Sequence, residues 1–138
     1  GSSWVEAMRI RGRRIVGGYA EGEALVSSAP FSFYGGVDPE TGVITEPGHP
    51  LEGESVAGRV FIFPHGRGST VGCYIIYRMY KRGTAPVAVI NLETETIIAT
   101  GCAMAGIPLM DRLEENPLRL IRSGDYIIVN ADEGYIEI

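Results

Sequence analysis

Residues 60–72, Val-Phe-Ile-Phe-Pro-His-Gly-Arg-Gly-Ser-Thr-Val-Gly, form the stretch that decides the fold. The apolar run Val60–Phe63 is typical of a buried strand, and Pro64 ends it because proline cannot donate to a sheet ladder. Two glycines in residues 65–68 allow a tight turn. Ser69-Thr70 then stands where a helix N-cap belongs. The stretch predicts a strand, a glycine loop and a helix.

The residues after this loop have the periodicity of an amphipathic helix. One face carries Cys73, Ile76 and Met79, and Gly83 ends the pattern just after two basic residues. The N-terminus of such a helix binds anions through its backbone amides. We therefore expect an anion site beside Arg67, with the hydroxyl of one serine directed at the bound molecule.

The rest of the chain predicts a mixed, β-rich α/β fold around this central strand–loop–helix unit. A second buried strand at residues 87–90 implies a parallel βαβ crossover, and the hydrophobic segment at residues 96–100 fits either a helix start or a strand. Further predictions are two strands within 8–28, a short strand or edge at 31–34, a strand at a sheet edge or strand end at 107–110, a short helix within 114–122, and a terminal hairpin at 126–129 and 135–138.

Length and composition limit the class of protein. The chain has 138 residues, 45% of them hydrophobic, which suits one globular domain over residues 8–138; residues 1–7 are expected to be a tag or a disordered N-terminus. A net charge of −5 argues against nucleic-acid binding, and no hydrophobic run has the length of a membrane helix. Two cysteines do not make a disulfide framework, so a reduced, cytoplasmic setting is expected.

Several side chains near the glycine loop are candidates for chemistry, each with a structural alternative. Ser69 is either an N-cap or a nucleophile or base, and Arg67 either clamps a carboxylate or phosphate or is a solvated loop residue. His65 is either a base or phosphoacceptor or a loop histidine bonded to backbone. Cys73 either lines the same site or packs in the core. His49 and the acidic turn residues carry little weight.

Some kinds of site are excluded by the pattern. Two cysteines cannot hold a 4Fe–4S cluster, which needs three or four cysteine ligands. The loop lacks both the P-loop spacing and the dinucleotide fingerprint.

Separated motifs along nearly the whole chain resemble the swivelling-domain small subunit of the aconitase X family. They are residues 33–42 (Phe-Tyr-Gly-Gly-Val-Asp-Pro-Glu-Thr-Gly), His49 with residues 53–59, residues 64–72, residues 83–86, residues 95–98, Ile107-Pro108 and Gly124-Asp125. The resemblance implies a swivelling β/β/α domain, which agrees with the mixed fold predicted above.

The resemblance also implies an activity. Archaeal members of this family resemble hydro-lyases that dehydrate (R)-5-phosphomevalonate to trans-anhydromevalonate 5-phosphate in a mevalonate pathway for isoprenoid biosynthesis. The chain would be active only in a heterodimer with a large subunit that carries a 4Fe–4S cluster, and would itself bind no metal. An open iron site there would act as a Lewis acid on the leaving hydroxyl.

Residue by residue, the proton acceptor of the family falls on Ser69. Arg67, Gly68 and Thr70 are then the candidate substrate-binding residues, with the amides of residues 68–71 holding a carboxylate or phosphate. Cys73 stands where many relatives are expected to have serine.

Three other functions stay open at this point. The first is the small subunit of a hydroxyproline dehydratase of the same family, with the same serine as base. The second is a phosphocarrier swivelling domain phosphorylated on His65, and the third a non-catalytic subunit whose glycine loop only binds an anion. In the dehydratase interpretation the surface near Ser69 should be apolar and open in the chain alone, and Phe31, Phe33 and Tyr34 belong either to that surface or to the core.

Overall fold

The computed structural model describes residues 8–138, so the interpretation of residues 1–7 as a tag or disordered N-terminus lies outside the described residues. Strands and short helices share this part of the chain. Their bounds are β1 (Arg9–Arg11), β2 (Arg13–Val16), β3 (Tyr19–Val26), α1 (Phe33–Gly36), β4 (Val60–Phe63), α2 (Gly72–Arg82), β5 (Ala88–Asn91), α3 (Thr96–Ala105), β6 (Leu109–Asp111), α4 (Pro117–Leu120), β7 (Tyr126–Asn130) and β8 (Tyr135–Glu137). Among residues 8–138, no helix has the length and apolar character needed to cross a bilayer.

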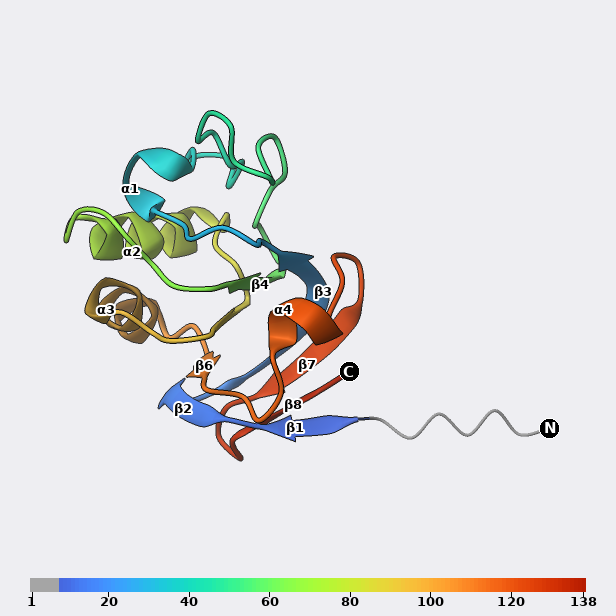
Figure 1. The fold of residues 1–138 in the computed structure, drawn as a ribbon. Coiled ribbons are helices and arrows are strands. Elements are labelled where there is room, and N and C mark those ends of the chain that lie inside the picture. The colour runs from blue at the N-terminus through green and yellow to red at the C-terminus, as the bar shows by residue number, and fades with distance from the viewer. Residues whose placement is uncertain (1–7) are drawn as a thin grey trace.

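The strands form one sheet in the order β1-β8-β7-β3-β4-β5-β6-β2 (Figure 1). The inner strands β3, β4, β5 and β6 run parallel, and the strands outside them pair antiparallel. The connections through α2 and α3 join β4 to β5 and β5 to β6, which confirms the predicted parallel pair around the glycine-loop helix. β7 and β8 form the predicted terminal hairpin. The fold is the mixed, β-rich α/β architecture that the sequence predicts.

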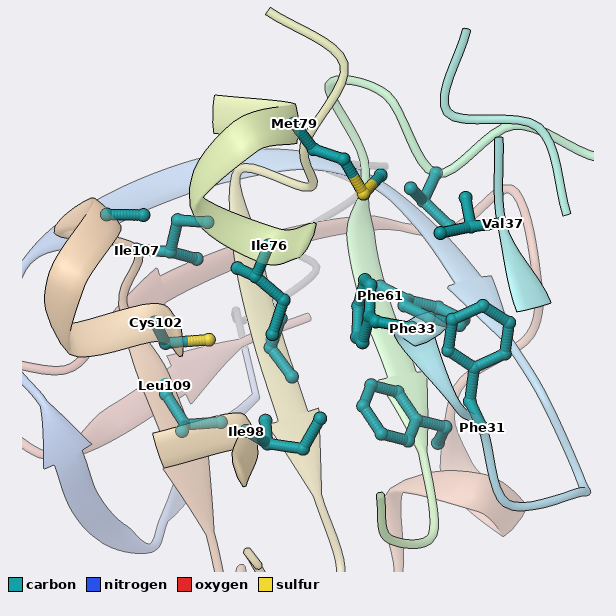
Figure 2. Close-up of a cluster of buried hydrophobic side chains, with 14 of the residues drawn as sticks. Phe31, Phe33, Val37, Phe61, Ile76, Met79, Ile98, Cys102, Ile107 and Leu109 are labelled. Carbon is teal, nitrogen blue, oxygen red and sulfur yellow. The ribbon is translucent and has the colours of Figure 1, made fainter. Parts of the chain in front are cut away.

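A hydrophobic core lies on each face of the parallel strands. Because side chains alternate along a strand, β4 directs Phe61 and Phe63 to one core and Val60 and Ile62 to the other. The first core is covered by α2 and α3, whose side chains meet the phenylalanine cluster in Figure 2. The second core joins the parallel strands to residues from β1, β7, β8 and the α4 region. The strand that leads into the glycine loop is therefore fully buried from both sides.

Residues 31–34 are not the strand or sheet edge that the sequence predicts. Phe31 makes only an isolated parallel bridge with Gly66, and the next residues form the short helix α1. Ser32 is still extended, but α1 contains the non-helical residue Tyr34 and then Gly35 at a φ of +85°, a conformation that favours glycine, so the chain turns here and does not pair as a strand. Phe31 and Phe33 are buried in the first core, whereas Tyr34 is 57% exposed. The phenylalanines thus belong to the core and the tyrosine to the surface.

Other predicted elements have shifted bounds. Residues 8–28 form three strands, not two, because Gly12 divides the segment before Gly17-Gly18 into β1 and β2. Gly17-Gly18 joins β2 to β3, and β3 continues through residues 20–22. The segment at 96–100 is the start of helix α3, and the helix within 114–122 is reduced to α4. β6 lies between β5 and β2, so residues 107–110 are not at a sheet edge; Pro108 stands just before the strand, as the strand-end alternative predicts.

Candidate active site

The glycine loop leaves the carboxyl end of β4, at the edge where the parallel strands finish. This edge is where open parallel sheets bind ligands. Buried polar side chains collect there: Asn91 ends β5 and Asp111 ends β6. The Asn91 side-chain amide donates to the carbonyl of Phe63 at 3.1 Å, which ties the end of β5 to the end of β4. The base of the loop is therefore fixed to the sheet on one side.

The loop is also fixed by backbone contacts to the segment before α1. Phe31 donates its N–H to the carbonyl of His65 at 3.2 Å, and Arg67 donates its N–H to the carbonyl of Phe31 at 3.1 Å. Neither loop glycine could carry a side chain without a clash, because a neighbouring residue lies too close to the place of its Cβ. A Cβ on Gly66 would lie 2.5 Å from Ile98 of α3, and a Cβ on Gly68, whose φ is +98°, would lie 2.4 Å from the Ser32 hydroxyl. The path of the loop is therefore set by backbone as much as by side chains.

Ser69 lies two residues before Val71, the assigned N-cap of the helix, so the cap predicted at Ser69 falls in the turn that leads into α2. Helix α2 begins at Gly72 with Val71 as its N-cap, and no side chain caps it. The Ser69 hydroxyl instead accepts the Val71 N–H at 3.2 Å, and its carbonyl accepts the Gly72 N–H at 3.0 Å. These bonds form a local turn that holds an exposed serine one turn before the helix.

Backbone amides lie on both sides of this serine. Among residues 8–138, no partner accepts the N–H groups of Gly68, Ser69 and Thr70, whereas the Val71 N–H is taken by the Ser69 hydroxyl. Three of the four backbone amides expected to bind an anion at 68–71 are therefore still without a partner among the described residues. Thr70 is exposed, and its carbonyl accepts the Cys73 thiol at 3.1 Å. Cys73 is buried at the start of α2.

Arg67 is brought together with a residue that sequence reasoning missed. Its Nη2 lies 2.5 Å from Oε1 of Glu46, which comes from the long connection between α1 and β4. The Arg67 side chain is 51% exposed, and that of Glu46 is 23% exposed. Glu46 has no motif around it in the sequence, so only the folded chain reveals the pair. Arg67 is neither an isolated clamp nor a freely solvated residue.

The two histidines take local structural bonds. His65 Nδ1 lies 2.9 Å from the Gly66 carbonyl and 3.5 Å from Glu95 Oε1. Since a carbonyl can only accept, Nδ1 carries the proton, which is the backbone-bonded arrangement given as the structural alternative. His49 is buried; its Nδ1 accepts the Leu51 N–H at 3.0 Å and its Nε2 lies 3.4 Å from the Ser27 hydroxyl. His49 therefore holds the loop in which it lies.

Hydrophobic side chains are exposed around the serine. Val71 is 43% exposed and Tyr74, one turn into α2, is 64% exposed. Tyr34 of α1, a helix in contact with α2, is also largely exposed. The start of α2 and the neighbouring α1 therefore carry exposed apolar side chains, the kind of surface that the dehydratase interpretation requires.

The residues present do not fit an iron–sulfur cluster. Within residues 8–138, no three His, Cys, Asp or Glu side chains lie close enough together to hold a metal ion. The cysteines are both free and buried. Burial raises the pKa of the Cys102 thiol to about 12, so it stays protonated and unsuited to metal ligation. No step of the chemistry can therefore be assigned to a cluster bound by this part of the chain.

Comparison with known proteins places this geometry in a family. The profile of the aconitase X swivel domain matches residues 9–138. The chain is 52% identical over 131 residues to the phosphomevalonate dehydratase small subunit of Methanosarcina acetivorans, covering 95% of this chain and 91% of that one. It is 53% identical to the protein of the same name from Methanocella arvoryzae, covering 95% and 99%.

A solved structure agrees with these relatives. The fold matches a chain in the crystal structure of Thermococcus kodakaraensis aconitase X in its holo-form with a TM-score of 0.90 and 46% identity. The match covers 95% of this chain and 98% of that chain. The chain therefore belongs to the aconitase X swivel-domain family.

Proposed function

We propose that this chain is the small subunit of an archaeal phosphomevalonate dehydratase that converts (R)-5-phosphomevalonate to trans-anhydromevalonate 5-phosphate. The chain is a subunit of a hydro-lyase that works with a large subunit. The observation that carries the substrate proposal is its near-full-length match, at about half of all positions, to relatives that bear this name. A cytoplasmic setting is part of the proposal, since both cysteines are free.

In this proposal Ser69 is the proton acceptor. As an alkoxide it would take the proton from the carbon next to the substrate carboxylate and become a hydroxyl, while the substrate's own hydroxyl leaves as hydroxide. Return of the proton from Ser69 to that hydroxide would complete the water molecule and restore the alkoxide. The Val71 N–H, which donates to the Ser69 oxygen, favours the anionic form of that oxygen. The N-terminus of α2 acts in the same direction, because its partial positive charge lies within a turn of the serine.

The other loop residues are proposed to bind the anionic substrate. Arg67 would meet a carboxylate or phosphate with the guanidinium donors that Glu46 does not use. The N–H groups of Gly68 and Thr70, which have no partner within residues 8–138, would complete the anion site. Only the anion-binding and proton-accepting parts of the reaction are assigned to this chain.

The remaining parts are proposed to come from the large subunit. In an exposed site, water screens the amide and the helix N-terminus that would stabilise the alkoxide of Ser69. The proposed reaction therefore requires a partner that covers Ser69 and excludes solvent. The exposed side chains of Tyr34, Val71 and Tyr74 offer an apolar rim for that contact. The expected 4Fe–4S cluster is proposed to belong to the large subunit, because the described residues here offer no set of ligands.

The test is the dehydration of 5-phosphomevalonate by the complex of this chain with its anaerobically prepared large subunit. Ser69→Ala should lower kcat about 10²–10⁴-fold, the usual contribution of a positioned base, without loss of complex formation. Ser55→Ala is the matched control, because the Ser55 hydroxyl makes only local backbone bonds in the connection between α1 and β4. Near-normal turnover with Ser69→Ala would reject the serine as the base. No turnover by the wild-type complex, with the cluster verified, would reject the substrate and favour the cyclic imino acid.

A further inference from the structure

The connection between α1 and β4 supplies two carboxylates to arginines of the β4–α2 unit. Glu40 meets Arg78 of α2 at 2.6 Å and Arg82 at 3.2 Å. Glu46, further along the connection, meets Arg67 in the glycine loop. The contacts of Glu40 lie along the body and C-terminal end of α2. The contact between Glu46 and Arg67 lies beside the proposed substrate site. Glu40 therefore serves as a matched control for Glu46, because it makes the same kind of ion pair away from the proposed substrate site.

Glu46 is held more firmly than an ordinary surface carboxylate. Its own segment is tied down on both sides, because Thr45 donates its N–H to the Gly36 carbonyl at 3.0 Å and His49 donates to the Glu46 carbonyl at 3.2 Å. The preceding Ile44 is fully buried. With only 23% of its side chain exposed, Glu46 has few alternative rotamers. Its carboxylate is thus a fixed point against which a flexible side chain can be oriented.

Arg67 is the flexible partner. Arginine has about 2 kcal/mol of side-chain rotamer entropy, and the backbone contacts of Arg67 do not restrict its guanidinium. Glu46 contacts only Nη2, so the other donors of the planar fork keep their directions but stay available. A guanidinium held from one end presents its remaining donors to an anion without first having to be ordered.

We propose that Glu46 is a positioning residue that orients Arg67 for the anionic end of the substrate. The proposal rests on the proposed function, in which Arg67 binds a carboxylate or phosphate. Glu46 itself touches neither the substrate nor the reacting atoms. It sets the direction of the guanidinium in advance and so lowers the cost of substrate binding.

The kinetic test uses the complete two-subunit enzyme and 5-phosphomevalonate. Glu46→Ala should raise KM about three- to tenfold, the cost of immobilising one flexible side chain on binding, and should change kcat less than about twofold. In an Arg67→Ala background the same substitution should have no further effect on KM, because the group that it orients is absent. Glu40→Ala, the matched control, should leave KM unchanged.

Three results with the substituted enzymes would overturn the proposal, and a fourth concerns inhibition by anions. A KM that falls with Glu46→Ala would mean that Glu46 competes with substrate for Arg67. An equal rise with Glu40→Ala would mean a general charge effect, and an undiminished effect of Glu46→Ala in the Arg67→Ala background would mean a structural role. Competition by inorganic phosphate and by acetate identifies the anionic end: Arg67→Ala should abolish inhibition by one of them, and unchanged inhibition by both would also count against the proposal.

A second measurement does not depend on turnover. In ¹⁵N-labelled full-length chain, the Arg67 guanidinium should show a high heteronuclear NOE at Nε–H and slow solvent exchange of the Nη2 hydrogens that donate to Glu46, and Glu46→Ala should abolish both while Glu40→Ala does not. Unchanged Arg67 signals in Glu46→Ala would overturn the proposal even if the dehydratase is confirmed. Conversely, if the wild-type complex fails to turn over 5-phosphomevalonate, the NMR result still decides whether Glu46 orients Arg67.

Discussion

The carboxylate of Asp111 at the end of β6 offers the sharpest test of how this edge of the sheet is held. The side chain is fully buried and accepts three charge-assisted hydrogen bonds. Arg13 of β2 donates through Nε and Nη2, and Thr94 donates its backbone N–H, all at 2.8 Å. The substitution Asp111→Asn preserves the shape but removes the charge, and it turns one acceptor into a donor that faces other donors.

The size of the effect follows from these contacts. A hydrogen bond to a charged group contributes about 1.5–3 kcal/mol, but the Arg13 side chain is 41% exposed and regains water when the carboxylate is lost. We therefore expect Asp111→Asn to lower the free energy of unfolding by about 2–3 kcal/mol, which corresponds to a fall of roughly 6–12 °C in Tm for a domain of this size. The surface pair Arg9–Glu137 is the control, and Glu137→Gln should cost about 0.5 kcal/mol or less.

The same carboxylate gives the effect a pH signature. Burial acts to raise the pKa of Asp111, but the hydrogen bonds from Arg13 and Thr94 outweigh it and hold the pKa below its ordinary value. The carboxylate therefore contributes its stability above the pKa of the unfolded chain, about 3.9, and loses it as the pH falls through the lower folded pKa. Thermal unfolding by circular dichroism should show wild type and Asp111→Asn converging below about pH 4. A Tm difference under about 2 °C at pH 7, or a gap as wide at pH 3 as at pH 7, would refute this account.

Three further predictions concern the packing of the helices and the loop. Gly101→Ala places a Cβ 2.6 Å from Ile76 Cδ1, so urea titration should give a net loss of about 1 kcal/mol despite the better helix propensity of alanine. With its pKa raised to about 12 by burial, Cys102 should resist iodoacetamide at pH 8 until the chain unfolds, and its contribution to stability should decline as the pH rises from about 9 towards 12; rapid labelling of folded protein would contradict this. Gly68→Ala is strained by its φ of +98° and by the Ser32 hydroxyl, so it should cost about 1–3 kcal/mol in thermal unfolding; a neutral result would mean that the loop adopts another path.

Local sequence patterns were enough to predict the centre of the fold. The run before Pro64, the periodicity of residues 72–82 and the glycine after them each act over a few residues, and β4, α2 and the left-handed cap at Gly83 follow directly. The parallel partner β5 was predictable for the same reason, because a helix between two buried strands leaves little choice of topology. The family resemblance added the identity of the candidate serine, which no local pattern provides.

What could not be predicted depends on residues far apart in the chain. Asp111 and Arg13 are 98 positions apart, and Glu46 and Arg67 are 21 apart across an irregular connection, so neither pair leaves a periodic signal. The start of α2 was misplaced for a different reason. A serine hydroxyl that accepts the amide two residues ahead makes the same bond as an N-cap, so the sequence does not separate a cap from a turn that precedes the helix.

The glycine loop is held by two kinds of contact, and this difference separates the proposed roles of its residues. Backbone bonds to Phe31 and the close approach of Gly66 to α3 fix the path of the chain and hence the place of Ser69. The direction of the Arg67 guanidinium depends instead on a single side-chain contact with Glu46. Substitutions at Glu46 can therefore alter anion binding without displacing the proposed base, whereas a change at Gly66 or Gly68 alters both. If the loop is rigid and only the Arg67 side chain is adjustable, a substitution at Glu46 should change KM and leave kcat nearly unchanged.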